Sequence, residues 1–164
     1  MAINPRLKAL LDRHGARYEV LPHRAAFTAQ DVARTTHVTG RRVAKVVVIR
    51  DEAGADLMVV IPATHHLDHG QLRTVTGRRG IHLEDEAELG RLFPDCETGT
   101  MPPFTALYGM PVYVDPCLAF ETNIYFQAGN HHEIVRMSYE EYSRVAAPIV
   151  MDVCLHREPM VMAN

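Results

Sequence analysis

The chain has 164 residues, a net charge of −3 and 47% hydrophobic residues. This length favours a single domain that buries about 70% of its unfolded surface. The charge excludes a generally basic nucleic-acid binder, so any RNA contact must come from a local patch. Three cysteines without C-x-x-C spacing argue against a disulfide framework. With no signal-peptide core and no apolar run of membrane length, we expect a cytoplasmic protein that does not enter membranes.

Helices are predicted by periodic leucines and by capping residues. Leu7, Leu10 and Leu11 have the spacing of one helix face. Thr28 and Ser138 have an acidic residue three positions later, as in a capping box, and Asp68 is a third candidate cap. We expect helices near residues 7–11, 30–36, 69–76, 84–92 and 139–145.

Strands are predicted by short β-branched and apolar runs. The runs over residues 43–49 and 57–61 flank turn chemistry at residues 51–54 and should form an antiparallel hairpin. Further strands are expected at residues 18–21, 81–83, 112–114, 122–126 and 134–137. This order predicts an α+β fold, a mixed or antiparallel sheet with flanking helices. We expect one domain over residues 1–164, with a core at about 5–148 and a methionine-containing tail, 149–164, that packs on the body or a partner, or frays.

The segment Gly99-Thr100-Met101-Pro102-Pro103-Phe104 is the most informative in the chain. Glycine permits a left-handed φ and a close ligand approach, and two prolines stiffen the backbone. Such a loop suits backbone polarisation of an ester carbonyl or the holding of a water, without a nucleophilic side chain. Taken alone, such a loop is more often a structural turn than a site.

Lys45 is the one charged residue within the Val- and Ile-rich run over residues 43–49. It is either an edge-strand lysine whose ammonium reaches solvent, or a pocket lysine that binds a phosphate or polarises a carbonyl as a point charge. The periodicity of the strand leaves both interpretations open.

Four sequence segments, in their order and spacing, make the chain resemble the YbaK/prolyl-tRNA-editing family of aminoacyl-tRNA deacylases over residues 5–148. The segments are Val43-Ala44-Lys45-Val46-Val47-Val48-Ile49, Gly99-x-x-x-Pro103 with Pro102-Phe104, Gly109-Met110-Pro111-Val112-Tyr113-Val114-Asp115 and Phe126-x-Ala128-Gly129. Many relatives have glycine where this chain has Thr105, which leaves the shape of the pocket edge open.

The resemblance implies trans-editing: hydrolysis of the ester of a misacylated tRNA, of tRNA-Pro type with a small amino acid. It implies catalytic roles for Lys45, Gly99 and Pro103, the loop backbone holding the oxyanion and the water. The H-x-x-x-x-T spacing of His23 and Thr28 is similar to the pocket edge of stand-alone relatives. Further expected substrate contacts are Met101, Pro102, Phe104, Gly129 and His131.

Three other features of the sequence point to different functions. The histidine clusters 65–69 and 131–132 lack zinc spacing, so we expect no metal and no cofactor. The G-x-x-G at residues 77–80 matches an RNA-binding clamp, but a strand is expected after it, and we interpret it as a basic turn. A non-catalytic ligand- or RNA-binding module on the same fold is the second functional hypothesis. The expected partners are the acceptor end of aminoacyl-tRNA and an aminoacyl-tRNA synthetase; the oligomeric state stays open.

Overall fold

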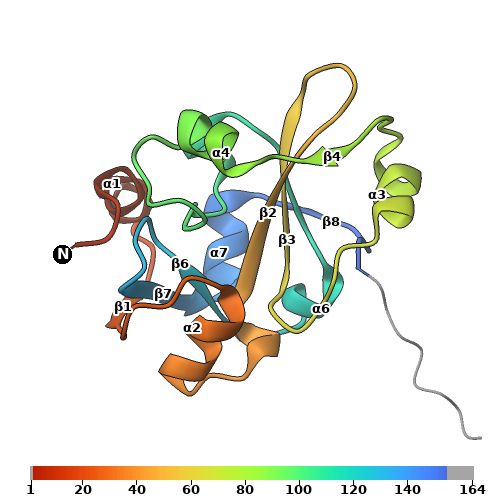
Figure 1. Ribbon diagram of the computed structural model, residues 1–164. Coiled ribbons are helices and arrows are strands. Elements are labelled where there is room, and N and C mark those ends of the chain that lie inside the picture. The colour runs from red at the N-terminus through yellow and green to blue at the C-terminus, as the bar shows by residue number, and fades with distance from the viewer. Residues whose placement is uncertain (1, 155–164) are drawn as a thin grey trace, which may run out of the picture.

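The computed structural model describes residues 2–154, which form two sheets surrounded by helices (Figure 1). The α-helices are α1 (Pro5–Arg13), α2 (Ala29–Thr36), α3 (His69–Thr76), α4 (Glu86–Leu92), α5 (Thr105–Tyr108), α6 (Pro116–Ala119) and α7 (Tyr139–Ala146), with a 3-10 turn at Gly40–Arg42. The strands are β1 (Glu19–Pro22), β2 (Ala44–Arg50), β3 (Asp56–Pro62), β4 (His82–Leu83), β5 (Val112–Val114), β6 (Asn123–Gln127), β7 (Glu133–Ser138) and β8 (Ile149–Val150).

The larger sheet has five strands in the order β4-β2-β3-β5-β8 and is mixed. β2 pairs antiparallel with β3 as the predicted hairpin, whereas β3–β5 and β5–β8 are parallel. The smaller sheet, β1-β7-β6, is antiparallel, and a parallel bridge from Val43 to Tyr125 joins it to the start of β2. The expected α+β class with a mixed sheet is confirmed.

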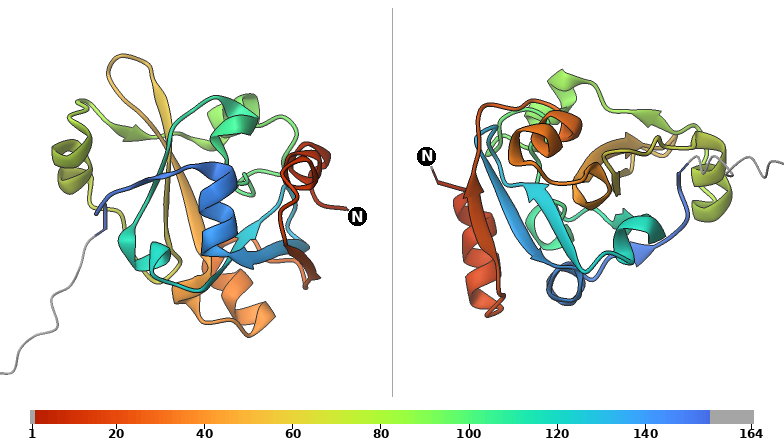
Figure 2. Two further views of the ribbon diagram at one scale, coloured as in Figure 1. Left: turned by 180° about the vertical axis from the view of Figure 1, so that it is seen from behind. Right: turned by 90° about the horizontal axis from the view of Figure 1, so that it is seen from below.

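Successive side chains of β2 point to opposite faces of the sheet, so the strand contributes to two apolar layers. Ala44 and Val48 face the main core, which lies between the sheets and takes in residues of α1 and α7. From behind, α7 crosses the β2–β3 hairpin (Figure 2). On the opposite face of β2, Ile49 belongs to a second cluster under α3, and Val43, just before β2, belongs to a third cluster under α2. The two faces of one strand therefore belong to different parts of the molecule.

The body extends further at its C-terminal end than the expected boundary at residue 148. Ile149–Val150 pairs with β5, and Val153 and Cys154 are buried. Ile149 and Val150 have no helical or alternating context in the sequence, and their partner strand lies more than thirty residues earlier. Two methionines of the expected tail, Met160 and Met162, lie outside the described residues.

Candidate active site

Three chain segments that are distant in sequence are hydrogen-bonded into one unit. They are the 22–28 segment between β1 and α2, the Gly99 loop (residues 95–104) and the 128–132 turn between β6 and β7. The Glu97 N–H donates to Gly129 O at 2.9 Å, and the Gly129 N–H donates to Thr100 O at 2.9 Å. The Ala26 N–H donates to His131 O at 3.0 Å. The 128–132 turn thus lies between the other two segments and joins them.

The Gly99 loop contains a tight turn with unused donors. Gly99 is exposed and has a φ of +87°, a conformation that favours glycine. Thr100 is fully buried, and both its N–H and its hydroxyl donate to Glu97 O, at 3.1 and 2.6 Å. Within residues 2–154, neither the Gly99 N–H nor the Met101 N–H makes a hydrogen bond. The turn therefore offers backbone donors beside an exposed glycine.

The second half of the loop is anchored in the core. Phe104 is completely buried and packs edge-on against Phe126 and Tyr142, with ring centroids 5.5 and 5.3 Å away. The Tyr142 hydroxyl donates to Pro103 O at 2.9 Å. Met101 is also buried in this core. These aromatic and apolar contacts fix the loop from below.

This burial changes the role that we assign to four residues. Met101, Pro102, Pro103 and Phe104 are all buried, and a side chain packed in the core does not face a substrate. We therefore interpret Met101 and Phe104 as supports that hold the loop, and the backbone at the exposed Gly99 as the part of the loop that is available for contact. The sequence pattern did not distinguish these roles because an apolar side chain next to a glycine turn suits either.

Thr105 occupies the position where many relatives have glycine. It is the first residue of α5, which follows Phe104 as N-cap. Among the described residues, positive φ outside glycine occurs only at His37 and Ala147. A helical backbone accepts threonine at small cost, so the departure from glycine creates no strain at the end of the loop.

Gly129 holds the 128–132 turn close to the N-terminus of α1. Its φ is +100°, and a Cβ placed there would lie 2.8 Å from the Cβ of Asn4. Asn4 caps α1 by accepting the Arg6 N–H, and its amide donates to Asp95 O and Oδ2, both at 2.9 Å. Gly129 is therefore required by close packing, and Asn4 links α1 to the Gly99 loop.

His131 connects the turn to both neighbouring segments through its side chain. Its Nδ1 lies 3.1 Å from Ala26 O; because a carbonyl only accepts, Nδ1 carries the proton and donates. Nε2 lies 3.7 Å from Glu97 Oε2, and the His131 side chain is 13% exposed. The Phe27 ring lies 4.7 Å from the imidazole, centroid to centroid. His131 is thus a nearly enclosed group at the centre of the three segments.

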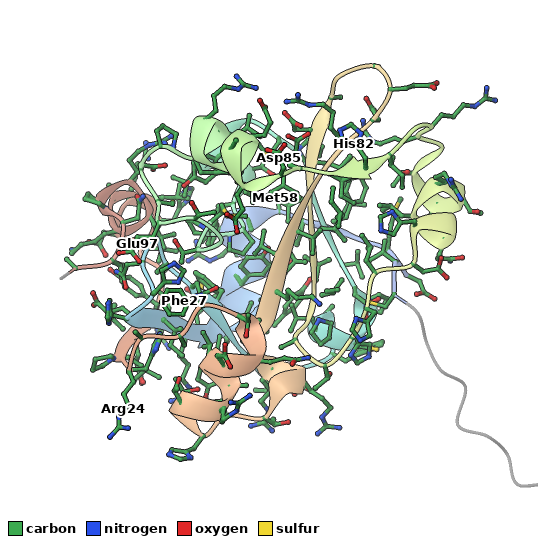
Figure 3. The ribbon with its side chains drawn as sticks, in the orientation of Figure 1. Arg24, Phe27, Met58, His82, Asp85 and Glu97 are labelled. Carbon is green, nitrogen blue, oxygen red and sulfur yellow. The ribbon has the colours of Figure 1, made fainter. Side chains whose placement is uncertain are left out.

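Glu97 and Phe27 belong to this site, although the sequence analysis did not select them. Glu97 Oε2 accepts the His131 N–H at 2.9 Å, and Phe27 is 68% exposed. Figure 3 shows both on the same side of the molecule, between α4 and α2. The available signals were a carboxylate two residues before Gly99 and an aromatic residue next to a helix cap.

Lys45 lies on the opposite face of β2 from the core that holds the loop. It pairs with Ile61 of β3 and shares its face with Val43, which packs under α2 with Ala26. Its Nζ donates to His65 O at 3.1 Å. The structure thus places Lys45 on the same side as the 22–28 segment and α2, and among the described residues it makes no hydrogen bond or ion pair with the Gly99 loop.

The edge of β2 next to Lys45 is open. β4 pairs only with Ile49 and Arg50, and the Glu84 N–H donates to Val48 O, whereas the bridge to β6 is at Val43. Between these points, no described strand pairs with this edge. The backbone of β2 at Lys45 therefore has no strand partner on this side.

His23 and Thr28 mark the two ends of the 22–28 segment. The His23 N–H donates to His132 O at 2.8 Å, and His23 lines a hollow of about 400 Å³ together with Pro22, His132 and Glu133. The His23 Nε2 is buried without a hydrogen-bond partner in the described chain. Thr28 is exposed, and its hydroxyl accepts the Asp31 N–H at 3.0 Å, which confirms the predicted helix cap.

The cysteines are poorly suited to nucleophilic chemistry. Burial raises the pKa of the Cys96 thiol to about 11, although Cys96 directly precedes Glu97 of the loop. Burial also raises the pKa of Cys117 and of Cys154. At neutral pH these side chains are thiols, which leaves backbone donors, a histidine, a carboxylate and a lysine as the candidate groups of the site.

Comparison with known proteins gives one consistent family. Residues 23–145 match the aminoacyl-tRNA editing domain. The multifunctional Ser/Thr-tRNA deacylase ProXp-y of Escherichia coli strain K12 is 28% identical over 148 residues, which cover 87% of each chain.

Two crystal structures show the same fold. Hypothetical protein APE2540 superimposes with a TM-score of 0.82 at 21% identity, over 91% of this chain and 99% of that one. A protein proposed to be a trans-editing enzyme for prolyl tRNA synthetase has a TM-score of 0.81 at 19% identity, over 94% of this chain and all of that one (100%). The residues that match the editing-domain family, 23–145, include all three segments of the candidate site except Pro22.

Proposed function

The chain belongs to the aminoacyl-tRNA editing domain family and is an aminoacyl-tRNA deacylase, and we propose that it acts in trans on a proline-type tRNA that carries a small wrong amino acid. The hydrolysed bond is the ester between the amino acid and the terminal ribose. Water adds to the carbonyl carbon, an oxyanion forms, and the ribose oxygen leaves with a proton.

One observation supports this function most directly: the free N–H groups at the Gly99 turn. Gly99 and Met101 offer donors that are not used within residues 2–154. The buried residues that follow, and the Tyr142 bond to Pro103 O, hold these donors in place. Fixed donors that stabilise developing negative charge lower the barrier to acyl transfer without a nucleophilic side chain.

The polar side chains around the turn complete the proposed chemistry. His131 donates through Nδ1 to Ala26 O, which leaves Nε2 as an acceptor in the neutral ring, 3.7 Å from the Glu97 carboxylate. In this arrangement Nε2 can hold the attacking water or take its proton. Lys45, on the α2 side of the open β2 edge, would bind the carbonyl oxygen or the terminal phosphate as a point charge.

The amino acid that is removed from the tRNA is also proposed. The E. coli relative is named as a Ser/Thr-tRNA deacylase, which makes serine and threonine the first candidates here; alanine and cysteine follow on size. One methyl group contributes only about 1–3 kcal/mol of discrimination in such a pocket. We therefore expect a graded preference among small amino acids.

The proposed setting is translation in the cytoplasm. Among the described residues, no helix is long and apolar enough to cross a membrane. The partner supported by the family is the acceptor end of aminoacyl-tRNA. A prolyl-tRNA synthetase is a second proposed partner, because a protein of the same fold is proposed as a trans-editing enzyme for that synthetase.

A deacylation screen tests the function. Purified protein is mixed with tRNA-Pro charged with alanine, serine, threonine, cysteine or proline, and loss of the labelled aminoacyl ester is followed over time. We expect hydrolysis of at least one small wrong amino acid well above the protein-free rate, with Pro-tRNA spared. If no aminoacyl-tRNA in the panel is hydrolysed while the folded protein still binds tRNA, the non-catalytic binding module becomes the better interpretation.

A further inference from the structure

Phe27 presents an exposed aromatic ring at a rigid position of the site. Its exposed fraction is 68%, which is high for a phenylalanine. The residues on both sides are fixed: the Ala26 N–H donates to His131 O, and the Thr28 hydroxyl accepts the Asp31 N–H as cap of α2. Ala26 itself is buried under α2. The backbone on both sides of Phe27 is therefore fixed, and the ring points outward from it.

The Phe27 ring is also close to the groups proposed to act on the ester. Its centroid is 4.7 Å from that of His131, at an interplanar angle of 47°. His131 in turn contacts Glu97, which begins the turn that contains Gly99. In Figure 3, Phe27 and Glu97 lie on the same side of the molecule. One imidazole thus separates the exposed ring from the Gly99 loop.

A nucleobase suits this ring better than a small amino acid does. A side chain such as that of serine or threonine covers only a small part of a phenyl ring, and a ring that walls a small pocket would be largely enclosed. A base has a flat face of matching size and stacks on exposed aromatic residues in single-stranded RNA recognition. The ribose that carries the ester also carries the terminal base, so the base must lie within one nucleotide of the Gly99 loop.

We propose that Phe27 is the stacking platform for the base of the 3′-terminal nucleotide of the tRNA. The inference rests on the proposed function, because it takes the ester to be bound at the Gly99 loop. Stacking fixes the terminal ribose next to His131 and the loop, and it does not depend on which amino acid is attached. Phe27 therefore contributes to RNA binding for every charged or uncharged tRNA with the same end.

The test uses a readout that requires no hydrolysis. A short uncharged RNA hairpin with a single-stranded CCA end carries 2-aminopurine in place of the terminal adenine, and its fluorescence falls when the base stacks. We expect wild type and Phe27→Tyr to quench the signal and bind alike. Phe27→Leu keeps apolar volume without an aromatic face, and Phe27→Ala lacks both. Both should lose the quenching and bind about 5- to 100-fold more weakly.

Phe120→Ala is the matched control, because Phe120 is still more exposed, at 88%, and caps the end of α6. It should quench and bind as wild type does. The proposal is overturned if Phe27→Ala or Phe27→Leu quenches the fluorescence as fully as wild type does. It is also overturned if Phe120→Ala loses quenching as Phe27→Ala does. A change in the preferred amino acid with unchanged quenching would make Phe27 a pocket wall instead.

Failure of this proposal is distinguishable from failure of the function. If wild type hydrolyses mischarged tRNA but does not quench the probe, the deacylase stands and the stacking is wrong. If wild type quenches the probe through Phe27 but hydrolyses nothing, the stacking stands and the catalytic proposal is wrong.

Discussion

The Glu97 carboxylate accepts the backbone N–H of His131 at 2.9 Å and so joins two segments that are 34 residues apart. The Glu97 main chain contributes as well, because its N–H donates to Gly129 O and its O accepts from Thr100. Glu97 therefore makes two of the hydrogen bonds that place the 128–132 turn beside the Gly99 loop, and the bond from the Gly129 N–H to Thr100 O is another.

Removing the Glu97 carboxylate should loosen this arrangement. We expect Glu97→Ala to lower the free energy of unfolding by about 1 kcal/mol, since one partly exposed charged hydrogen bond is lost. The deacylation rate should fall about 10- to 100-fold, because small displacements of reacting groups are costly. Glu97→Gln keeps an oxygen that accepts the N–H and should retain the stability. Chemical denaturation and single-turnover kinetics check both, and an unchanged rate in Glu97→Ala would remove Glu97 from the site.

The catalytic role that the family resemblance implies for Lys45 can be tested by substitution. Lys45→Met keeps the apolar stem and removes the charge, so the fold should lose at most about 1 kcal/mol for the bond to His65 O. We expect at least about a tenfold loss of deacylation, and no recovery in Lys45→Arg, because a planar guanidinium does not replace an ammonium at a close contact. Wild-type turnover by Lys45→Met would instead indicate a lysine that only packs against β3.

We expect Cys96 to take no part in the deacylation reaction. Because burial raises its pKa to about 11, the thiol is protonated throughout the neutral range. We expect Cys96→Ser to deacylate at close to the wild-type rate and iodoacetamide at neutral pH to leave the activity of the wild type intact. Stoichiometric inactivation by alkylation, absent in Cys96→Ser, would point to a covalent route.

Arg78 and Arg79 are neighbours with different roles: Arg78 forms an ion pair with Asp51, whereas Arg79 is exposed. Arg78 Nη1 lies 2.7 Å from Asp51 Oδ2; the backbone N–H groups of Ala55 and Ala53 and the Arg78 guanidinium together hold the pKa of Asp51 below 3.8. A carboxyl with a lowered folded pKa stabilises the fold above pH 3.8 and loses this contribution as the pH falls through the folded value.

We therefore expect Arg78→Ala to lower the melting temperature at neutral pH, and the difference from wild type to shrink under acid. Arg79→Ala removes an exposed neighbouring charge and should leave the melting temperature unchanged. Thermal melts between neutral and acidic pH measure both. Equal melting temperatures for the two variants at neutral pH would mean that the Asp51 pair does not stabilise the fold.

The sequence predicts most local structure because caps and apolar runs are local signals. Thr28, Asp68 and Ser138 cap the expected helices, and the β2–β3 hairpin forms where β-branched runs flank a turn. The short helices α5 and α6 have four residues each, too few for a periodic pattern. The body was therefore predicted more fully than its short connecting elements.

The candidate site is less predictable because it depends on long-range hydrogen bonds. The contact of Phe27 with His131 joins positions on two separate segments, and nothing near either residue signals the other. The side on which Lys45 lies depends on the strand register, since a shift of one residue would turn it to the other face. The sequence pattern indicates the loop and the lysine but does not determine how they are arranged in space.

The role of the Gly99 backbone is tested most directly by comparing Gly99→Ala with Gly54→Ala. Both glycines have left-handed φ values, +87° and +81°, and at both a Cβ meets nothing within 4 Å. Each substitution should therefore cost a similar free energy of unfolding, about 1–2 kcal/mol. Gly54 lies in the turn between β2 and β3, whereas Gly99 carries one of the proposed donors.

The decisive measurement is the single-turnover rate of ester hydrolysis for these two variants on the mischarged tRNA that wild type prefers. We expect Gly54→Ala to match wild type and Gly99→Ala to be about 100-fold slower at equal folded fraction. Equal rates for the two variants would contradict a catalytic role of the Gly99 loop backbone.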